Sequence, residues 1–183
     1  MKVGFERRRS MTITYRLRQG FKALLAFSQP VDVELASQYL SPKLLTLFQN
    51  MNRDEQLHSL NVLRGVLTQG TTPPELAVAA LLHDVGKSCY PIGVGQKTFA
   101  VLVRTVWPDL YRRWSKGNPL NLWQRPFVVY ERHPQWGAEW VTEAGGSEPT
   151  QWLVAHHADA SEKWADHVHF ELLKRLQAAD DAN

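Results

Sequence analysis

The sequence contains a single cysteine, Cys89, so no disulfide can form within the chain. One free thiol suits a reducing compartment, and we expect a cytoplasmic location. No apolar run approaches the roughly 18 residues that a transmembrane helix requires. The basic start of the sequence, MKVGFERRRS, lacks the apolar stretch and cleavage site of a secretory signal peptide. We therefore expect neither a disulfide-stabilised fold nor a transmembrane segment.

Strand-like alternation of apolar and polar residues is nearly absent, and occurs only in the short stretch DHVHF at 166–170. Apolar residues recur instead at helical spacing, and proline and glycine residues separate the segments. We therefore predict an all-α fold, with a helical bundle over 51–183 and an N-terminal helical extension over 1–50. The expected helices are 15–27 (amphipathic and basic), 32–39, a short one from 42, 54–69, 75–85, 96–113 with an interruption at Trp107-Pro108, 126–132, 134–143, 149–157 and 170–182.

The charge balance is mildly basic, with 21 Lys and Arg residues against 18 Asp and Glu residues and a pI of ≈ 9.1. Such a balance helps to attract phosphate-bearing ligands. It is too small to indicate a nucleic-acid-binding protein, so we do not expect a nucleic acid polymer as a partner.

The run AALLHDVGK at 79–87 places three polar side chains directly after a core-like segment. The expected helix 75–85 is apolar nearly all round, so it should be the central buried helix and carry His83 and Asp84 in its last turn. A buried unpaired charge costs several kcal/mol, so these groups need a partner, which is often a metal ion.

Other histidines and aspartates stand at the ends or edges of expected helices. His58 lies at the edge of an apolar arc, and Gly65 leaves room for another element to approach the same face. Imidazole and carboxylate are ligands of first-row metals, and an aspartate can bridge two ions. We favour a metal site over a purely structural histidine network, and the candidate ligands are His58, His83, Asp84, His133 before Pro134, His156 and His157 at a helix end, and Asp180 on the apolar face of the last helix.

The pattern His58…His83-Asp84…Asp180 resembles the H…HD…D signature of the HD superfamily of metal-dependent phosphohydrolases. The similarity includes LHSLNV, LLHDVGK and LQAADDAN around these residues and covers roughly 55–183. His133, in ERHPQWGAEWV, and the His156-His157 pair are similar to the additional ligands of two-metal members, such as the HD-GYP cyclic-di-GMP phosphodiesterases and the HD-type diadenosine tetraphosphate hydrolases. No Gly-Tyr-Pro signature follows His157, so the resemblance favours a mononucleotide or dinucleotide over cyclic-di-GMP.

The resemblance implies an HD domain over 51–183 that cleaves a phosphomonoester or phosphodiester of a small phosphorylated substrate by metal-activated hydroxide. One ion would be bound by His58, His83, Asp84 and Asp180, and a second would share Asp84 and take His133 with one or both of His156 and His157. Asp84 would then be central to catalysis, and Lys87 could hold a phosphate or leaving-group oxygen. Mixed imidazole and carboxylate ligands favour Fe or Mn, with Zn, Ni or Mg as alternatives.

Three other interpretations compete. A regulatory HD module would bind metal without turnover, although a degenerate module typically loses ligands. Lys87 could be a surface lysine beside a helix end. A structural zinc site would mostly use thiolate ligands, and the chain offers only Cys89. The oligomeric state does not follow from the sequence.

Overall fold

The computed structural model describes residues 30–183, and within this range the chain is helical and contains no β-strand. The all-α prediction is confirmed for this part of the chain, whereas the helix expected at 15–27 lies outside it. None of the described helices has the length and apolar character needed to cross a membrane. The elements are α2 (Val33–Ser37), α3 (Pro42–Gln49), α4 (Arg53–Thr68), α5 (Pro74–Leu82), the 3₁₀ helix η1 (Val85–Cys89), α6 (Val94–Val106), α7 (Pro108–Trp114), α8 (Arg125–Glu143), α9 (Glu148–His156), the 3₁₀ helix η2 (Ser161–Trp164) and α10 (Phe170–Asp181).

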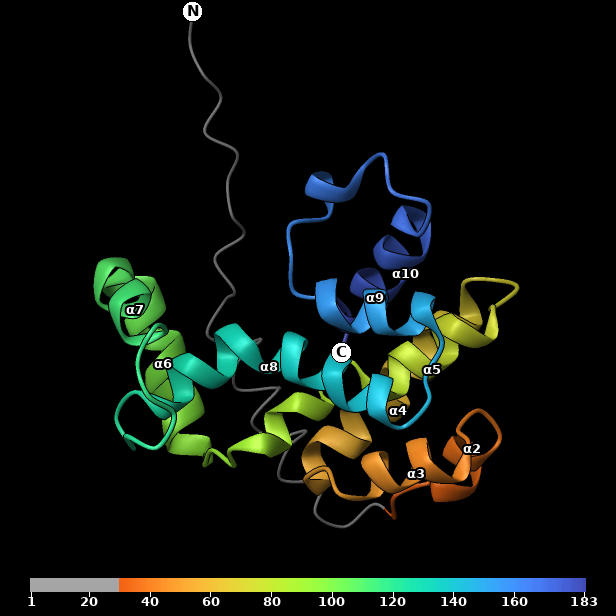
Figure 1. The fold of residues 1–183 in the computed structure, drawn as a ribbon, viewed down its shortest axis with the longest axis horizontal. Helices are drawn as coiled ribbons and strands as arrows, with labels where there is room; N and C mark the ends of the chain where they lie inside the picture. Colours follow the sequence, from red (N-terminus) through yellow and green to blue (C-terminus); the bar gives the residue numbers. More distant parts are fainter. Residues whose placement is uncertain (1–29) are drawn as a thin grey trace, which may run out of the picture.

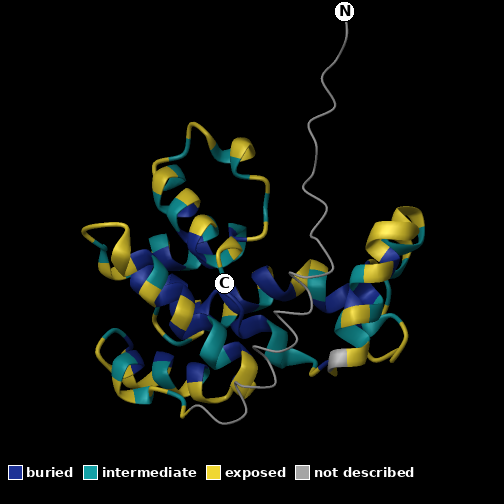
Figure 2. Ribbon diagram, turned by 180° about the vertical axis from the view of Figure 1, so that it is seen from behind, coloured by how far each residue is buried: buried dark blue, intermediate teal, exposed yellow. Residues whose placement is uncertain are grey.

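Helix α5 lies at the centre of the main body, as its apolar composition predicts (Figures 1 and 2). Helices α3, α4, α9 and α10 pack around it. The same hydrophobic core includes Ala36 of α2 and Leu44 and Phe48 of α3. The described part of the predicted N-terminal extension therefore packs into the core of the bundle.

Helix α8 joins this main body to a smaller arm formed by α6 and α7 (Figure 1). Near its start, Phe127 packs with Ala100 and Val103 in a second, smaller hydrophobic cluster. Further along, Ala138 and Val141 belong to the main core. The interruption predicted at Trp107-Pro108 separates α6 from α7, and both helices contact α8.

The prediction of two helices at 126–132 and 134–143 is wrong, because α8 runs through Pro134 without a break. A proline has no N–H and therefore cannot bond the carbonyl four residues earlier, which here belongs to Tyr130. The Nδ1 atom of His133 compensates, since it lies 3.1 Å from the Tyr130 oxygen and 3.0 Å from the Val129 oxygen. The side chain that the helix uses to tolerate its proline is thus one of the predicted metal ligands.

Helix α5 ends at Leu82, earlier than predicted, and the tighter turn η1 continues the chain. This turn presses against α8 at two glycines, Gly86 and Gly137. A Cβ atom on Gly86 would lie 2.0 Å from the carbonyl oxygen of His133 and 2.7 Å from the nitrogen of Gly137. Because only glycine allows this approach, Gly86 brings Asp84 next to His133.

Candidate metal centre

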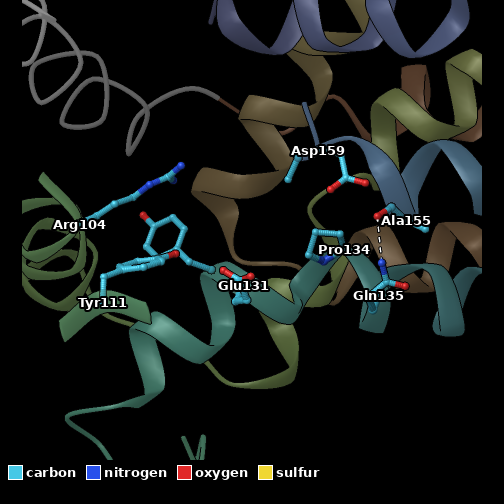
Figure 3. A pocket seen from close by; sticks show the side chains of 9 residues that line it. Arg104, Tyr111, Glu131, Pro134, Gln135, Ala155 and Asp159 are labelled. Carbon is cyan, nitrogen blue, oxygen red and sulfur yellow. Dashed lines mark hydrogen bonds between the residues drawn. The ribbon is translucent and has the colours of Figure 1, made fainter. Parts of the chain in front are cut away.

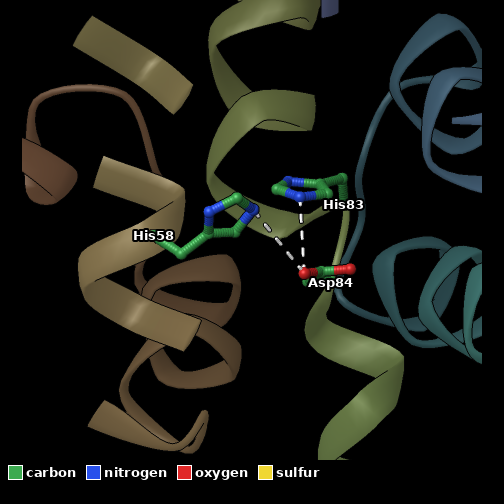
Figure 4. A group of neighbouring side chains, drawn as sticks. All are labelled: His58, His83 and Asp84. Carbon is green, nitrogen blue, oxygen red and sulfur yellow. Dashed lines mark ion pairs between the residues drawn. The ribbon is translucent and has the colours of Figure 1, made fainter. Parts of the chain in front are cut away.

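His83 and Asp84 lie side by side between α5 and η1, buried in the main body (Figure 4). His83 is the C-cap residue of α5, and its Nδ1 donates to the carbonyl of Ala80 at 3.0 Å. Its Nε2 is buried without a hydrogen-bond partner and lies 3.5 Å from Oδ2 of Asp84. A buried ring nitrogen without a hydrogen-bond partner and beside a carboxylate fits the role of a metal ligand.

His58 of α4 and Asp180 of α10 complete this side of the cluster. The Nε2 of His58 lies 2.9 Å from Oδ1 of Asp180 and 3.8 Å from Oδ2 of Asp84. The same Asp180 oxygen lies 3.6 Å from Nε2 of His83. Asp180 follows the buried residues Leu173, Leu176 and Ala179, so its predicted placement on the apolar face of the last helix is confirmed.

Gly65 allows α10 to come this close. A Cβ atom on Gly65 would lie 3.1 Å from the Cβ of Ala179, the residue before Asp180. The approaching element expected at this face is therefore α10. The apolar arc expected on this helix comprises Leu57, Leu60, Leu63, Val66 and Leu67. The buried side of α4 is rotated from it, because Ser59 and Val62 are buried whereas Leu67 is exposed. This rotation turns His58 toward α5.

His133 and His157 approach the other oxygen of Asp84. Their Nε2 atoms lie 3.3 Å and 3.6 Å from Oδ1 of Asp84, and 3.2 Å from each other. His157 is the C-cap residue of α9, and its Nδ1 donates to the carbonyl of Val154 at 2.8 Å. Both rings are buried.

The same kind of backbone hydrogen bond orients the three buried histidines of the cluster, which are His83, His133 and His157. Each stands where a helix ends or contains a proline, and each donates Nδ1–H to a carbonyl that lacks its usual helical partner, namely that of Ala80, Tyr130 or Val154. The hydrogen on Nδ1 leaves the neutral ring with a bare lone pair on Nε2. Metal-binding histidines are commonly fixed in this way, with the second ring nitrogen bonded to a carbonyl or carboxylate.

The donor set therefore fits a divalent metal. Two groups of ligand atoms are close enough together to hold an ion, and Asp84 belongs to both. One group consists of His58, His83 and Asp84, with Asp180 adjacent, and the other of Asp84, His133 and His157.

The electrostatics keep the two aspartates ionised. Burial raises the pKa of Asp84, but the charges of Lys87 and His83 outweigh it and hold the pKa well below its usual range. Burial likewise opposes ionisation of Asp180, yet its bonds to His58 and His83 lower the pKa strongly. Both carboxylates are thus available as anionic ligands at neutral pH.

In the metal-free chain the pKa values of His83 and His157 are shifted in opposite directions. Burial disfavours the charged form of His83, but the nearby carboxylates of Asp84 and Asp180 raise its pKa to about 9. For His157, burial dominates and lowers the pKa to about 4. His83 therefore carries a proton that an incoming cation would displace, whereas His157 is neutral and its Nε2 can bind a metal ion directly.

Lys87 is held inside the site and is not a surface lysine. Its Nζ lies 2.5 Å from Oδ2 of Asp84 and 3.8 Å from Oε2 of Glu55. Glu55 is buried, and Oε1 of its carboxylate accepts a bond of 2.6 Å from Lys97. Glu55 is not among the residues predicted from the sequence, although its position one helical turn before His58 places it on the same side of α4.

An open pocket of about 400 Å³ leads to the cluster. Tyr130, which the sequence analysis also missed, lines this pocket together with Lys87 and the exposed Asp181. His156 does not line it. Its Nδ1 faces Oδ2 of Asp159 at 2.9 Å, and its ring packs against Trp152 and Trp164.

All the predicted ligands except His156 are therefore brought together around Asp84. Adjacent residues on a helix point about 100° apart, so only one of His156 and His157 can face the site.

Comparison of the chain with protein-family models, curated proteins and solved structures found no match.

Proposed function

We propose that the chain is a metal-dependent phosphohydrolase of the HD type, acting on a small phosphoester such as a nucleotide or dinucleotide. One observation carries the proposal: four imidazole Nε2 atoms converge on a single buried carboxylate, two on each of its oxygens. The distances to Asp84 are 3.5 and 3.8 Å at Oδ2, and 3.3 and 3.6 Å at Oδ1. Such an arrangement suits a carboxylate shared between two ions, as in two-metal phosphoesterases.

The proposed site binds two divalent ions, with Fe or Mn favoured by its imidazole and carboxylate ligands. His58, His83 and Asp180 would hold one ion, and His133 and His157 the other, with Asp84 common to both. Bound ions supply a Lewis acid that generates hydroxide at neutral pH and neutralises charge on phosphoryl oxygens.

Lys87 has a separate role in this proposal. Burial would lower its pKa, but the charges of Asp84 and Glu55 raise it, so the ammonium remains charged at neutral pH. A compact positive charge at the pocket can stabilise a phosphoryl or leaving-group oxygen. Glu55 gives the ammonium a second partner at 3.8 Å, which keeps it at the site when Asp84 binds metal.

Metal analysis coupled to a substrate screen tests the proposal. The purified chain would be stripped with a chelator, reloaded separately with Mn²⁺, Fe²⁺, Zn²⁺, Ni²⁺ and Mg²⁺, and assayed on phosphomonoesters, mononucleotides, dinucleotides and cyclic-di-GMP. We expect hydrolysis that disappears on chelation, returns with metal and is absent from Asp84→Asn. A chain that binds metal at Asp84 but hydrolyses nothing would support the regulatory module instead, and a chain that binds no metal would contradict both.

A further inference from the structure

A second, smaller pocket lies beside the metal centre, with a volume of about 190 Å³. It shares Tyr130 and Ala158 with the pocket that leads to Asp84, so the two pockets are neighbours. One wall comes from the arm, where Arg104 of α6 and Tyr111 of α7 line the pocket (Figure 3). The floor is formed by α8 with Glu131 and Gln135 (Figure 3).

The arm brings an arginine and a tyrosine side chain together in the wall of this pocket. The guanidinium carbon of Arg104 lies 5.7 Å from the centre of the Tyr111 ring. Tyr111 is held in place by an edge-to-face contact with Phe127, whose ring centre is 5.7 Å away. Aromatic rings and arginine planes are the groups on which nucleobases stack in proteins.

Tyr130 connects this surface to the metal centre. Tyr130 lines both pockets, together with Arg104, Tyr111 and Glu131 in the smaller one and with Lys87 and Asp84 in the larger one. In the larger pocket, Lys87 is bonded to Asp84. A molecule with one end at Lys87 and the other at Tyr111 would therefore pass along Tyr130.

The charges of the second pocket disfavour a phosphate there. Arg104 brings one positive charge, whereas Glu131 and Asp159 bring two carboxylates. Asp159 is already bonded by His156, Lys163 and Trp164. Among residues 30–183, Glu131 forms no ion pair with a basic side chain, so it can accept hydrogen bonds from a ligand.

A second acceptor lies on the same helix. The Nε2 of Gln135 donates to the carbonyl of Ala155 at 3.2 Å, which leaves the Oε1 atom of that amide to accept (Figure 3). Glu131 and Gln135 therefore bring two acceptors to the pocket that Arg104 and Tyr111 also line, and this lining matches a flat ring that carries an amino group. A uracil, thymine or hypoxanthine ring carries no exocyclic amino group to donate.

We propose that the pocket formed by Arg104, Tyr111, Tyr130, Glu131 and Gln135 binds the amino-bearing nucleobase of a nucleotide whose phosphate lies at the metal centre. The inference rests on the proposed phosphohydrolase function, and it identifies the substrate class as nucleotides of adenine, cytosine or guanine.

Substrate pairs test this subsite. The metal-loaded chain would be assayed on adenosine monophosphate, inosine monophosphate and ribose 5-phosphate, which has the sugar phosphate but no base. We expect Arg104→Ala to lower kcat/KM for adenosine monophosphate about tenfold, as for the loss of one stacking contact, without changing that for ribose 5-phosphate. Glu131→Gln should reduce the preference for adenosine over inosine monophosphate. Arg112→Ala is the matched control, because Arg112 is an exposed arginine on the same arm that pairs with Asp109.

Equal effects of Arg104→Ala on all three substrates, or no effect on any, would overturn the subsite. If none of the three substrates is hydrolysed, the proposed function fails for mononucleotides, and a binding measurement tests the subsite instead. Equilibrium dialysis with the metal-loaded chain would then compare adenosine monophosphate with ribose 5-phosphate. Tighter binding of the nucleotide that is lost in Arg104→Ala supports the subsite, and equal binding of the two molecules contradicts it.

Discussion

The Nε2 atoms of His133 and His157 face each other at 3.2 Å, while the Nδ1 atom of each ring is directed at a backbone carbonyl. In neutral rings of this tautomer, both Nε2 atoms are acceptors and their lone pairs repel. Burial keeps His157 neutral by lowering its pKa to about 4. A cation between or beside the two nitrogens would remove this repulsion, and Oδ1 of Asp84 lies close enough to both nitrogens to bind the same cation.

Asp84→Asn should remove metal from both halves of the centre. The substitution keeps the shape of the side chain but removes the negative charge that both ligand groups share. We expect a wild-type content of about two ions per chain to fall below one, and phosphoester hydrolysis to disappear, while helical circular dichroism is retained. Metal content by mass spectrometry checks this. Asp181→Asn, at an exposed aspartate of the same pocket, is the control and should retain both ions.

His133→Ala should remove one ion and leave the other. His133 contacts only Oδ1 of Asp84, whereas His58 and His83 lie on the Oδ2 side. We expect His133→Ala to lose about one ion per chain, and His58→Ala to lose the other, with a binding isotherm of a single class of site in each case. Loss of both ions from His133→Ala would mean that the halves are not separable.

Metal affinity should rise with pH up to about 9. In the metal-free chain the pKa of His83 is raised from 6.5 to about 9, so the ring is protonated at pH 7 and metal must displace that proton. Displacement of one proton makes affinity increase about tenfold per pH unit between pH 7 and 9. Competition with a chelator of known affinity, measured across this range, checks the slope. An affinity that does not change over these two units would contradict a protonated His83.

The raised pKa of His83 also makes the stability of the metal-free chain depend on pH. Stability falls as the pH rises, whereas metal affinity rises. A histidine whose folded pKa is raised contributes stability that is fully present below the unfolded value of 6.5 and is lost as the pH rises through about 9. Urea denaturation of the metal-free chain should therefore shift to lower midpoints between pH 7 and 9.5. His83→Gln should lack this part of the shift.

Gly86→Ala should destabilise the chain, because the new Cβ would lie 2.0 Å from a backbone oxygen of α8 that cannot move independently. Overpacking at such a site costs about 2–3 kcal/mol. Gly95→Ala is the matched control, since nothing lies within 4 Å of its Cβ position and α6 would gain up to about 1 kcal/mol from the better helix former. Urea denaturation compares the two, and a neutral Gly86→Ala would show that η1 and α8 can separate at no cost.

Much of this fold was predictable because most helix ends carry local signals. Prolines at the first turn of α3, α5, α7 and α9 mark their starts, and the apolar composition of α5 predicts its central place. The continuity of α8 was not predictable from Pro134 alone. It depends on the His133 side chain, whose Nδ1 donates to the Tyr130 carbonyl that the proline leaves without a donor and to the adjacent carbonyl of Val129.

The candidate ligands were predictable as a set, but their partners were not. Choosing between His156 and His157 requires the rotation of α9, which places His156 against Asp159 and the two tryptophans. The ion pair of Lys87 with Asp84 depends on how η1 turns after α5. Tyr130 reaches the pocket only because α8 crosses from the arm to the bundle. These features arise from contacts between elements, which periodicity along one element does not specify.

The central claim is that two divalent ions share the carboxylate of Asp84, and an anomalous difference map tests it most directly. Crystals of the chain grown with Mn²⁺ would be measured with X-rays at which manganese scatters anomalously. We expect two peaks, one among His58, His83, Asp180 and Oδ2 of Asp84, and one among His133, His157 and Oδ1 of Asp84. A map without a peak at either place, with the Lys87 ammonium still on Asp84, would contradict the claim.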